Sequence, residues 1–212
     1  QRIARGPAGS TGWRVDDAPF DAVVLATTST EAARLVLTAH TAHPTLQGPE
    51  AAALQAWARK AQALRFTAIA TVYAQTSALP QGTVLSQPML ALRPGAGQPA
   101  QFVFDRMQLG GPAGLLAFVV SASEGDRATL EREVLQQAQD QLGLQGLRIV
   151  QTVVEKRATF ACTPALQRPP QTVANGLCAC GDYVEGPYPA TLEGAVLSGT
   201  AAAGTPVAAT MA

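Results

Sequence analysis

The residues best suited to chemistry lie in one stretch near the C-terminus, from Cys180 to Gly199. An apolar segment at 176–180 runs into Gly181-Asp182, a loop with prolines and glycine follows, and a run of small residues then predicts a helix. A strand that ends in glycine and directs a helix N-terminus brings backbone N–H groups close to an anion or to the polar edge of a cofactor. We therefore interpret this stretch as a ligand-contacting strand–loop–helix, while noting that tight packing alone can also require such glycines.

The evidence for a metal or redox site elsewhere in the sequence is weaker. His40 and His43 have a spacing that places two metal ligands on one helical turn, but two ligands do not make a site. Cys178 and Cys180 alternate along an expected buried strand and lack a second cysteine pair. We expect histidines on the surface, cysteines with a structural role, and no metal site.

The composition narrows the class of protein. The chain has 212 residues, of which 47% are hydrophobic and 14% are charged, and its formal net charge is zero. The hydrophobic share is enough for a core. The zero net charge gives no indication of a basic surface that would bind a nucleic acid. Three cysteines, an odd number, argue against a disulfide framework and favour a reducing, cytoplasmic compartment.

The pattern of apolar residues predicts a mixture of helices and strands. The continuous apolar run at 20–26 is typical of a strand buried on both faces. A capping-box pattern at 28–31, Pro49-Glu50, and Asp126 followed later by Gly143 predict the ends of three helices. Because several strands follow one another between helices, we predict an α/β fold with α+β character and a mixed sheet; these strands are expected at 66–73, 88–92, 101–105, 115–121 and 147–154.

The stretch 181–199 resembles a known cofactor-binding signature. Pro189-Ala190-Thr191-Leu192-Glu193-Gly194-Ala195, followed by Ser198-Gly199, is similar to the C-terminal flavin-binding signature of the flavin amine oxidase and phytoene (carotenoid) desaturase superfamily. Lys156 to Pro164 resembles the subgroup of squalene-associated FAD-dependent desaturases, which are hydroxysqualene dehydroxylases of hopanoid synthesis.

The resemblance implies a domain arrangement. The end of the FAD-domain strands is expected at 1–28, a mixed-sheet substrate-binding domain with packed helices at 29–155, the C-terminal FAD-contact segment of a Rossmann-like domain at 156–204, and a disordered tail at 205–212. The Gly-x-Gly-x-x-Gly fingerprint that holds the ADP half of FAD in this superfamily is not in the sequence. We therefore expect a C-terminal fragment of a longer enzyme, inactive alone and without FAD when isolated.

The resemblance also implies a function. We expect an FAD-dependent oxidoreductase that acts on an apolar isoprenoid, either by dehydroxylation of hydroxysqualene to squalene or by phytoene-type desaturation. A flavin amine oxidase and a non-catalytic binding module of the same fold are the alternatives. The expected FAD contacts come from six residues: Gly181, Asp182, Pro189, Ala190, Thr191 and Leu192.

Catalytic residues are not assigned by the resemblance, because Asp182, Tyr183, Glu185 and Tyr188 are all close in sequence to the expected flavin contacts. The expected partner is the isoprenoid substrate. We expect no nucleic-acid partner. Peripheral contact with a membrane and self-association through apolar surface are further expectations.

Overall fold

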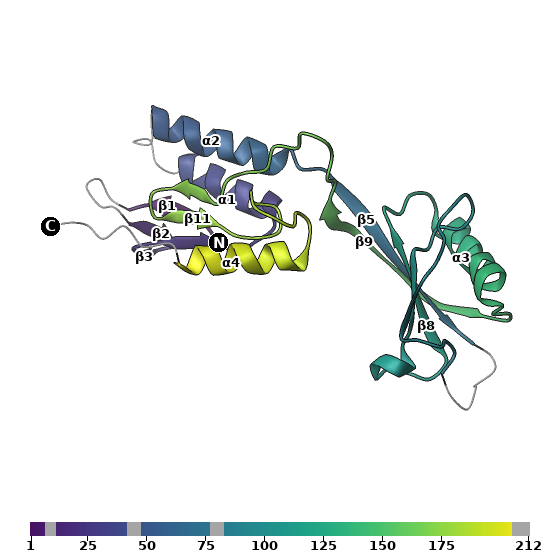
Figure 1. The fold of residues 1–212 in the computed structure, drawn as a ribbon. Coiled ribbons are helices and arrows are strands. Elements are labelled where there is room, and N and C mark those ends of the chain that lie inside the picture. Colours follow the sequence, from purple (N-terminus) through teal and green to yellow (C-terminus); the bar gives the residue numbers. More distant parts are fainter. Residues whose placement is uncertain (7–11, 42–47, 77–82, 205–212) are drawn as a thin grey trace. The chain divides into compact units, whose positions relative to one another are not determined.

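A computed structural model describes residues 1–6, 12–41, 48–76 and 83–204. The chain divides into two compact units (Figure 1). Unit 1 comprises 1–65 and 160–212, and unit 2 comprises 66–159. Unit 2 is therefore an insertion within the sequence of unit 1.

Two small sheets are formed by the part of unit 1 that the structure describes. One has the antiparallel order β1-β2-β3, formed by Ile3–Arg5, Trp13–Val15 and Ala18–Phe20. The other has the order β10-β11-β4, in which β11 pairs antiparallel with β10 and parallel with β4; these strands are Thr172–Ala174, Leu177–Ala179 and Val23–Leu25.

The described residues of unit 1 form three helices: α1 (Ser29–Thr41), α2 (Pro49–Gln62) and α4 (Leu192–Gly204). In Figure 1, α1 and α2 lie on one side of the strands and α4 on the other. Apolar residues spaced along one face of α1 and of α2 are buried, as is Leu64 just after α2; those on the helices are Ala32, Leu35, Val36, Ala39, Leu54, Trp57, Ala58 and Ala61.

The start of α1 follows the predicted pattern in part. The amide of Glu31 donates to Oγ1 of Thr28 at 3.4 Å, so Thr28 caps the helix as expected. The Glu31 carboxylate pairs with Arg34, one turn further on, at 2.5 Å. The structure therefore shows the cap residue of the box but uses its glutamate for a surface ion pair.

The prediction that β4 is buried on both faces is wrong for the described residues. Strand β4 lies at the end of its sheet, and Val24 is 45% exposed, whereas Leu25 is buried. A continuous apolar run predicts a strand that can be buried, but it does not show the position of the strand in the sheet. Here β4 is an edge strand, with no neighbouring strand on one side among the described residues.

Unit 2 is built on a five-stranded sheet with the order β6-β7-β8-β5-β9. The strands predicted at 88–92 and 101–105 are present as β6 and β7, which pair antiparallel as a hairpin. The last strand continues beyond the predicted 147–154, so that Glu155-Lys156-Arg157 lies within a strand rather than at its end. The strands are β5 (Phe66–Gln75), β6 (Met89–Ala91), β7 (Phe102–Asp105), β8 (Leu115–Ser121) and β9 (Arg148–Phe160), and a short 3₁₀ helix occupies Met107–Leu109.

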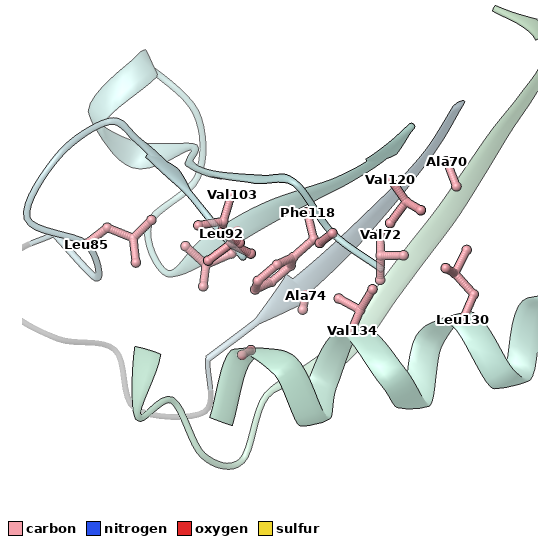
Figure 2. Packing of buried hydrophobic residues seen from close by; sticks show 13 residues of the cluster. Ala70, Val72, Ala74, Leu85, Leu92, Val103, Phe118, Val120, Leu130 and Val134 are labelled. Carbon is pink, nitrogen blue, oxygen red and sulfur yellow. The ribbon is translucent and has the colours of Figure 1, made fainter. Parts of the chain in front are cut away.

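Helix α3 (Arg127–Leu142) covers one face of this sheet. Its ends are as predicted: Oδ1 of Asp126 accepts from the amide of Thr129 at 2.9 Å, and Gly143 adopts a left-handed conformation. Figure 2 shows Leu130 and Val134 of α3 packed toward Val72 and Phe118 of the sheet. This contact buries the core of unit 2.

The observed units do not follow the predicted domain boundaries. Helices α1 and α2 group with unit 1, although they fall within the range 29–155 predicted for the substrate-binding domain. They group this way because the indole nitrogen of Trp57 on α2 donates to the carbonyl of Pro170, 2.7 Å away, and α2 packs beside β10. The compact body within that range begins only at Phe66. The predicted tail at 205–212 lies outside the described residues.

Candidate functional site

The predicted strand–loop–helix is present in unit 1. Strand β11 lies parallel to β4, and beyond its end the amide of Cys180 still donates to the carbonyl of Leu25 at 3.1 Å. The chain then turns through Gly181-Asp182 and reaches α4 at Leu192. The carboxyl ends of neighbouring parallel strands are where open α/β sheets bind ligands, so this edge is the candidate site.

Gly181 has a packing reason to be glycine. Its φ is +152°, and a Cβ at this position would come within 2.7 Å of the ring of Tyr183. Its amide donates to Oγ of Ser198 on α4 at 2.9 Å. The predicted approach of Gly181 to a cofactor stays a prediction, because these contacts already account for the glycine and its N–H.

The loop before α4 is held in a strained conformation. Tyr188 and Ala190 have φ values of +52° and +59°, which non-glycine residues adopt at a cost. A Cβ on Gly194 would lie 2.3 Å from the carbonyl oxygen of Tyr188, so the loop folds back against the helix only because Gly194 lacks a side chain. Thr191 fixes the same contact, since its hydroxyl donates to the Tyr188 carbonyl at 2.6 Å and accepts from the Gly194 amide at 3.0 Å.

Thr191 is therefore the N-cap of α4, and its hydroxyl accepts a hydrogen bond from the Gly194 amide. The amides of Leu192 and Glu193 are in the first turn, so no carbonyl of the helix lies one turn before them to accept their hydrogen bonds. The Leu192 side chain is 87% exposed. Two open N–H groups at the positive end of a helix dipole suit a ligand edge that carries negative charge.

Burial affects two titratable side chains after β11. It raises the pKa of the Asp182 carboxyl, while a backbone hydrogen bond and the positive charge of Arg168 oppose the rise. Burial also raises the pKa of Tyr183, and the nearby Cys180 and Asp182 raise it further. Within the described part of the chain, the Tyr183 hydroxyl is buried without a hydrogen-bond partner. A polar atom in this state is costly unless a further group satisfies it.

These observations fit a flavin. Its polar ring edge matches the open amides at the start of α4, and its hydroxylated chain could supply partners for the polar groups that follow β11. The six residues predicted from the sequence occupy three places in this strand–loop–helix. Gly181 and Asp182 follow the end of β11, Pro189 and Ala190 belong to the connecting loop, and Thr191 and Leu192 are at the start of the helix.

The other candidates give no second site. Cys178 and Cys180 are half-buried, and burial raises the pKa of both thiols. No group of three or more metal-ligating side chains occurs among residues for which the structure gives positions. His43 and the side chain of His40 lie outside the described residues. None of the helices in the described ranges is both long and apolar enough to cross a membrane.

Arg168 was not identified from the sequence. Its guanidinium donates to the carbonyl of Val184 at 2.7 Å and to that of Gly186. A signal was available, since Arg168 is the one charged residue between Arg157 and Asp182 and precedes two prolines. Its side chain reaches the candidate site from a separate segment of the chain.

Comparison with known proteins identifies the family. A search of curated proteins finds no match. The fold is similar to the crystal structure of an oxidoreductase from Methanosarcina mazei, with a TM-score of 0.59 and 14% sequence identity over 96% of this chain. The chain spans 48% of that protein's length. The family model described as flavin containing amine oxidoreductase matches residues 3–205. A match over nearly the whole sequence, together with the strand–loop–helix described above, shows that this chain belongs to the flavin containing amine oxidoreductase family.

Proposed function

We propose that this chain forms part of an FAD-dependent oxidoreductase whose substrate is an apolar isoprenoid. The observation that carries the flavin assignment is the start of α4, where Thr191 caps the Gly194 amide and the amides of Leu192 and Glu193 have no acceptor among the described residues. The family is flavin-containing, and FAD is the form of flavin that the signature at 181–199 favours.

In this proposal each part of the loop has its own task. The amides of Leu192 and Glu193 would face the pyrimidine edge of the flavin, where the helix dipole would stabilise negative charge by about 0.3–2 kcal/mol. Asp182 accepts hydrogen bonds from hydroxyl groups of the ribityl chain. Pro189 and Ala190 give the loop the shape that places the helix end.

The proposed substrate class is supported by a face of unit 2. The strand register places Thr71, Val119, Phe102 and Ala91 in one cross-strand row. The next row on the same face contains Tyr73, Ala117, Phe104 and Met89.

This face is opposite the one that α3 covers, because side chains alternate along each strand and Val72, Phe118 and Val103 point to α3. Met89 and Phe102 are 49% and 39% exposed. An open face of aromatic and aliphatic side chains suits a hydrocarbon chain better than a polar amine.

For hydroxysqualene, the reaction would replace a hydroxyl group with hydrogen. The C–O bond breaks as a proton joins the hydroxyl, which leaves as water, and a hydride forms the new C–H bond. Bound reduced flavin would supply the hydride and become oxidised. This chain's part is to orient the cofactor and to keep the substrate on an apolar surface.

The test uses the full-length gene product that contains this chain. We expect it to purify with a flavin absorption spectrum, and heat-released cofactor to be FAD by chromatography. The reduced protein, mixed anaerobically with hydroxysqualene, should reoxidise and form squalene; oxidised protein with phytoene tests the desaturase form of the proposal.

The alternatives give different results in the same experiment. Reduction of the flavin by an amine, with no response to either isoprenoid, would identify an amine oxidase. A colourless protein that takes up no added FAD would indicate a binding module that has lost its cofactor. The upstream gene sequence is a second check, because the proposal expects a strand–turn–helix with Gly-x-Gly-x-x-Gly there.

A further inference from the structure

We infer that Arg168 is a positioning residue for the flavin site, holding the loop before α4 in its strained conformation and placing a positive charge on that loop. The inference rests on the proposed function for its flavin-linked effects. Its structural part stands on the hydrogen bonds of the loop itself.

The guanidinium of Arg168 binds the loop at two points. It donates from Nη1 to the Val184 carbonyl at 2.7 Å and from Nη2 to the Gly186 carbonyl. The two carbonyls are two residues apart, and the planar guanidinium offers donors in a fixed fork that matches such a pair. The ammonium group of a lysine lacks this geometry.

The segment that carries Arg168 is itself anchored. The carbonyl of Pro169 accepts from the amide of Glu185 at 2.9 Å, so the neighbouring backbone binds the same loop. The carbonyl of Pro170 accepts from the indole nitrogen of Trp57 at 2.7 Å, and Trp57 is buried in α2. The segment of Arg168 thus connects the loop to helix α2 of unit 1.

The loop needs such a support. Tyr188 and Ala190 have positive φ values, and residues other than glycine keep such values only where surrounding contacts hold them there. Thr191 and Gly194 fix the side of the loop next to α4. Arg168 and Pro169 fix the side next to β11, so the two sets of contacts hold the loop from both ends.

The charge of Arg168 has a separate effect. Burial raises the pKa of the Asp182 carboxyl, and the positive charge of Arg168 opposes this rise. A positive charge near the flavin contacts also favours the reduced, more negative form of the cofactor. Charge and hydrogen bonding can be separated by substitution.

Three variants of the full-length protein test the inference. Arg168→Gln removes both the fork and the charge, and Arg168→Lys keeps the charge but loses the fork. Arg34→Gln is the matched control, because Arg34 forms an exposed ion pair with Glu31 on α1. The measurements are hydrogen exchange of the 184–190 amides, the FAD dissociation constant and the midpoint potential of the bound flavin.

We expect faster exchange at 184–190 in both Arg168 variants and no change in Arg34→Gln. FAD binding should weaken about tenfold in both Arg168 variants, because each loses the two-point contact that holds the loop. The midpoint potential should fall in Arg168→Gln and stay near the wild-type value in Arg168→Lys.

The outcomes separate this inference from the proposed function. Unchanged exchange in Arg168→Gln overturns the inference whether or not flavin binds. Faster exchange in a protein that binds no flavin supports the loop-holding role and contradicts the proposed function. Wild-type affinity and potential in both Arg168 variants of a flavin-loaded protein overturn the flavin-linked part.

Discussion

The hydroxyl of Ser198 on α4 lies 2.9 Å from the amide nitrogen of Gly181 and 3.0 Å from its carbonyl oxygen. It accepts a hydrogen bond from that amide, and one side chain therefore ties the end of β11 to the helix that follows the loop. This contact fixes the two ends of the candidate site to each other.

Replacing Ser198 by alanine should lower the stability of unit 1. The variant leaves the part-buried Gly181 amide without its partner, which costs about 1 kcal/mol. Chemical denaturation followed by the fluorescence of the two tryptophans, both in unit 1, would measure the change. Thr200→Ala is the control, because its hydroxyl bonds within the helix to Val196; equal stability of the wild type and Ser198→Ala would contradict the prediction.

Two glycines of α4 should respond oppositely to alanine. Replacing a glycine inside a helix by alanine normally stabilises the protein by about 1 kcal/mol. At Gly199 nothing lies within 4 Å of the new Cβ, so Gly199→Ala should be stabilising. At Gly194 the new Cβ would lie 2.3 Å from the Tyr188 carbonyl oxygen, so Gly194→Ala should be destabilising. Thermal unfolding of the pair measures the difference, and a stabilising Gly194→Ala would show that the loop moves freely.

The cap of α4 can be tested through stability and cofactor binding together. Thr191→Val keeps the shape of the side chain but removes the hydroxyl that bonds Tyr188 and Gly194, and should cost about 1 kcal/mol of helix stability. In the flavin-loaded full-length protein it should also weaken FAD binding, measured by fluorescence titration. Thr191→Ser retains the hydroxyl and should restore both properties; if it behaves like the valine variant, the cap is not the cause.

Asp105 should make the stability of unit 2 depend on pH. The residue is 0% exposed. Burial alone would raise its pKa, but hydrogen bonds from Gln108, Leu85, Val84 and Met107 outweigh this effect and leave the pKa below its usual value. Because the folded-state pKa is lowered, the carboxylate stabilises the fold above the unfolded-state pKa, and this contribution is lost as the pH falls through the folded-state value.

Asp105→Asn should therefore destabilise the protein by about 1.5–3 kcal/mol at neutral pH and flatten the dependence of stability on pH in the acid range. Asp140→Asn, whose carboxylate accepts from the exposed side chain of Gln136, is the control for the change in charge. Denaturation midpoints from neutral to acid pH measure both effects, and parallel curves for the wild type and Asp105→Asn would refute this role.

Local features were predicted well because their causes are local. The cap at Asp126 and the stop at Gly143 depend on a few neighbouring residues, and both are confirmed. The features that differ from the predictions are those that depend on the tertiary arrangement. The apolar run around Val24 could not show that β4 lies at the edge of its sheet, and helical periodicity could not show that α2 packs in unit 1.

The candidate site shows the same division. The residues 181–192 were located by their sequence pattern, yet the parts that Gly181 and Thr191 play in packing became visible only from their contacts with Tyr183, Ser198 and Gly194. Arg168 is separated from the loop in sequence, so its partners could not be inferred from spacing.

The insertion of unit 2 has a consequence for how such proteins diversify. At its base the amide of Ala161 donates to the carbonyl of Arg65 at 2.7 Å, so the chain leaves and re-enters unit 1 at one point. A segment whose ends meet can be lengthened, shortened or exchanged by recombination while the remaining fold stays closed. Relatives of this chain can therefore acquire new surfaces in unit 2 and inherit the 181–199 loop unaltered.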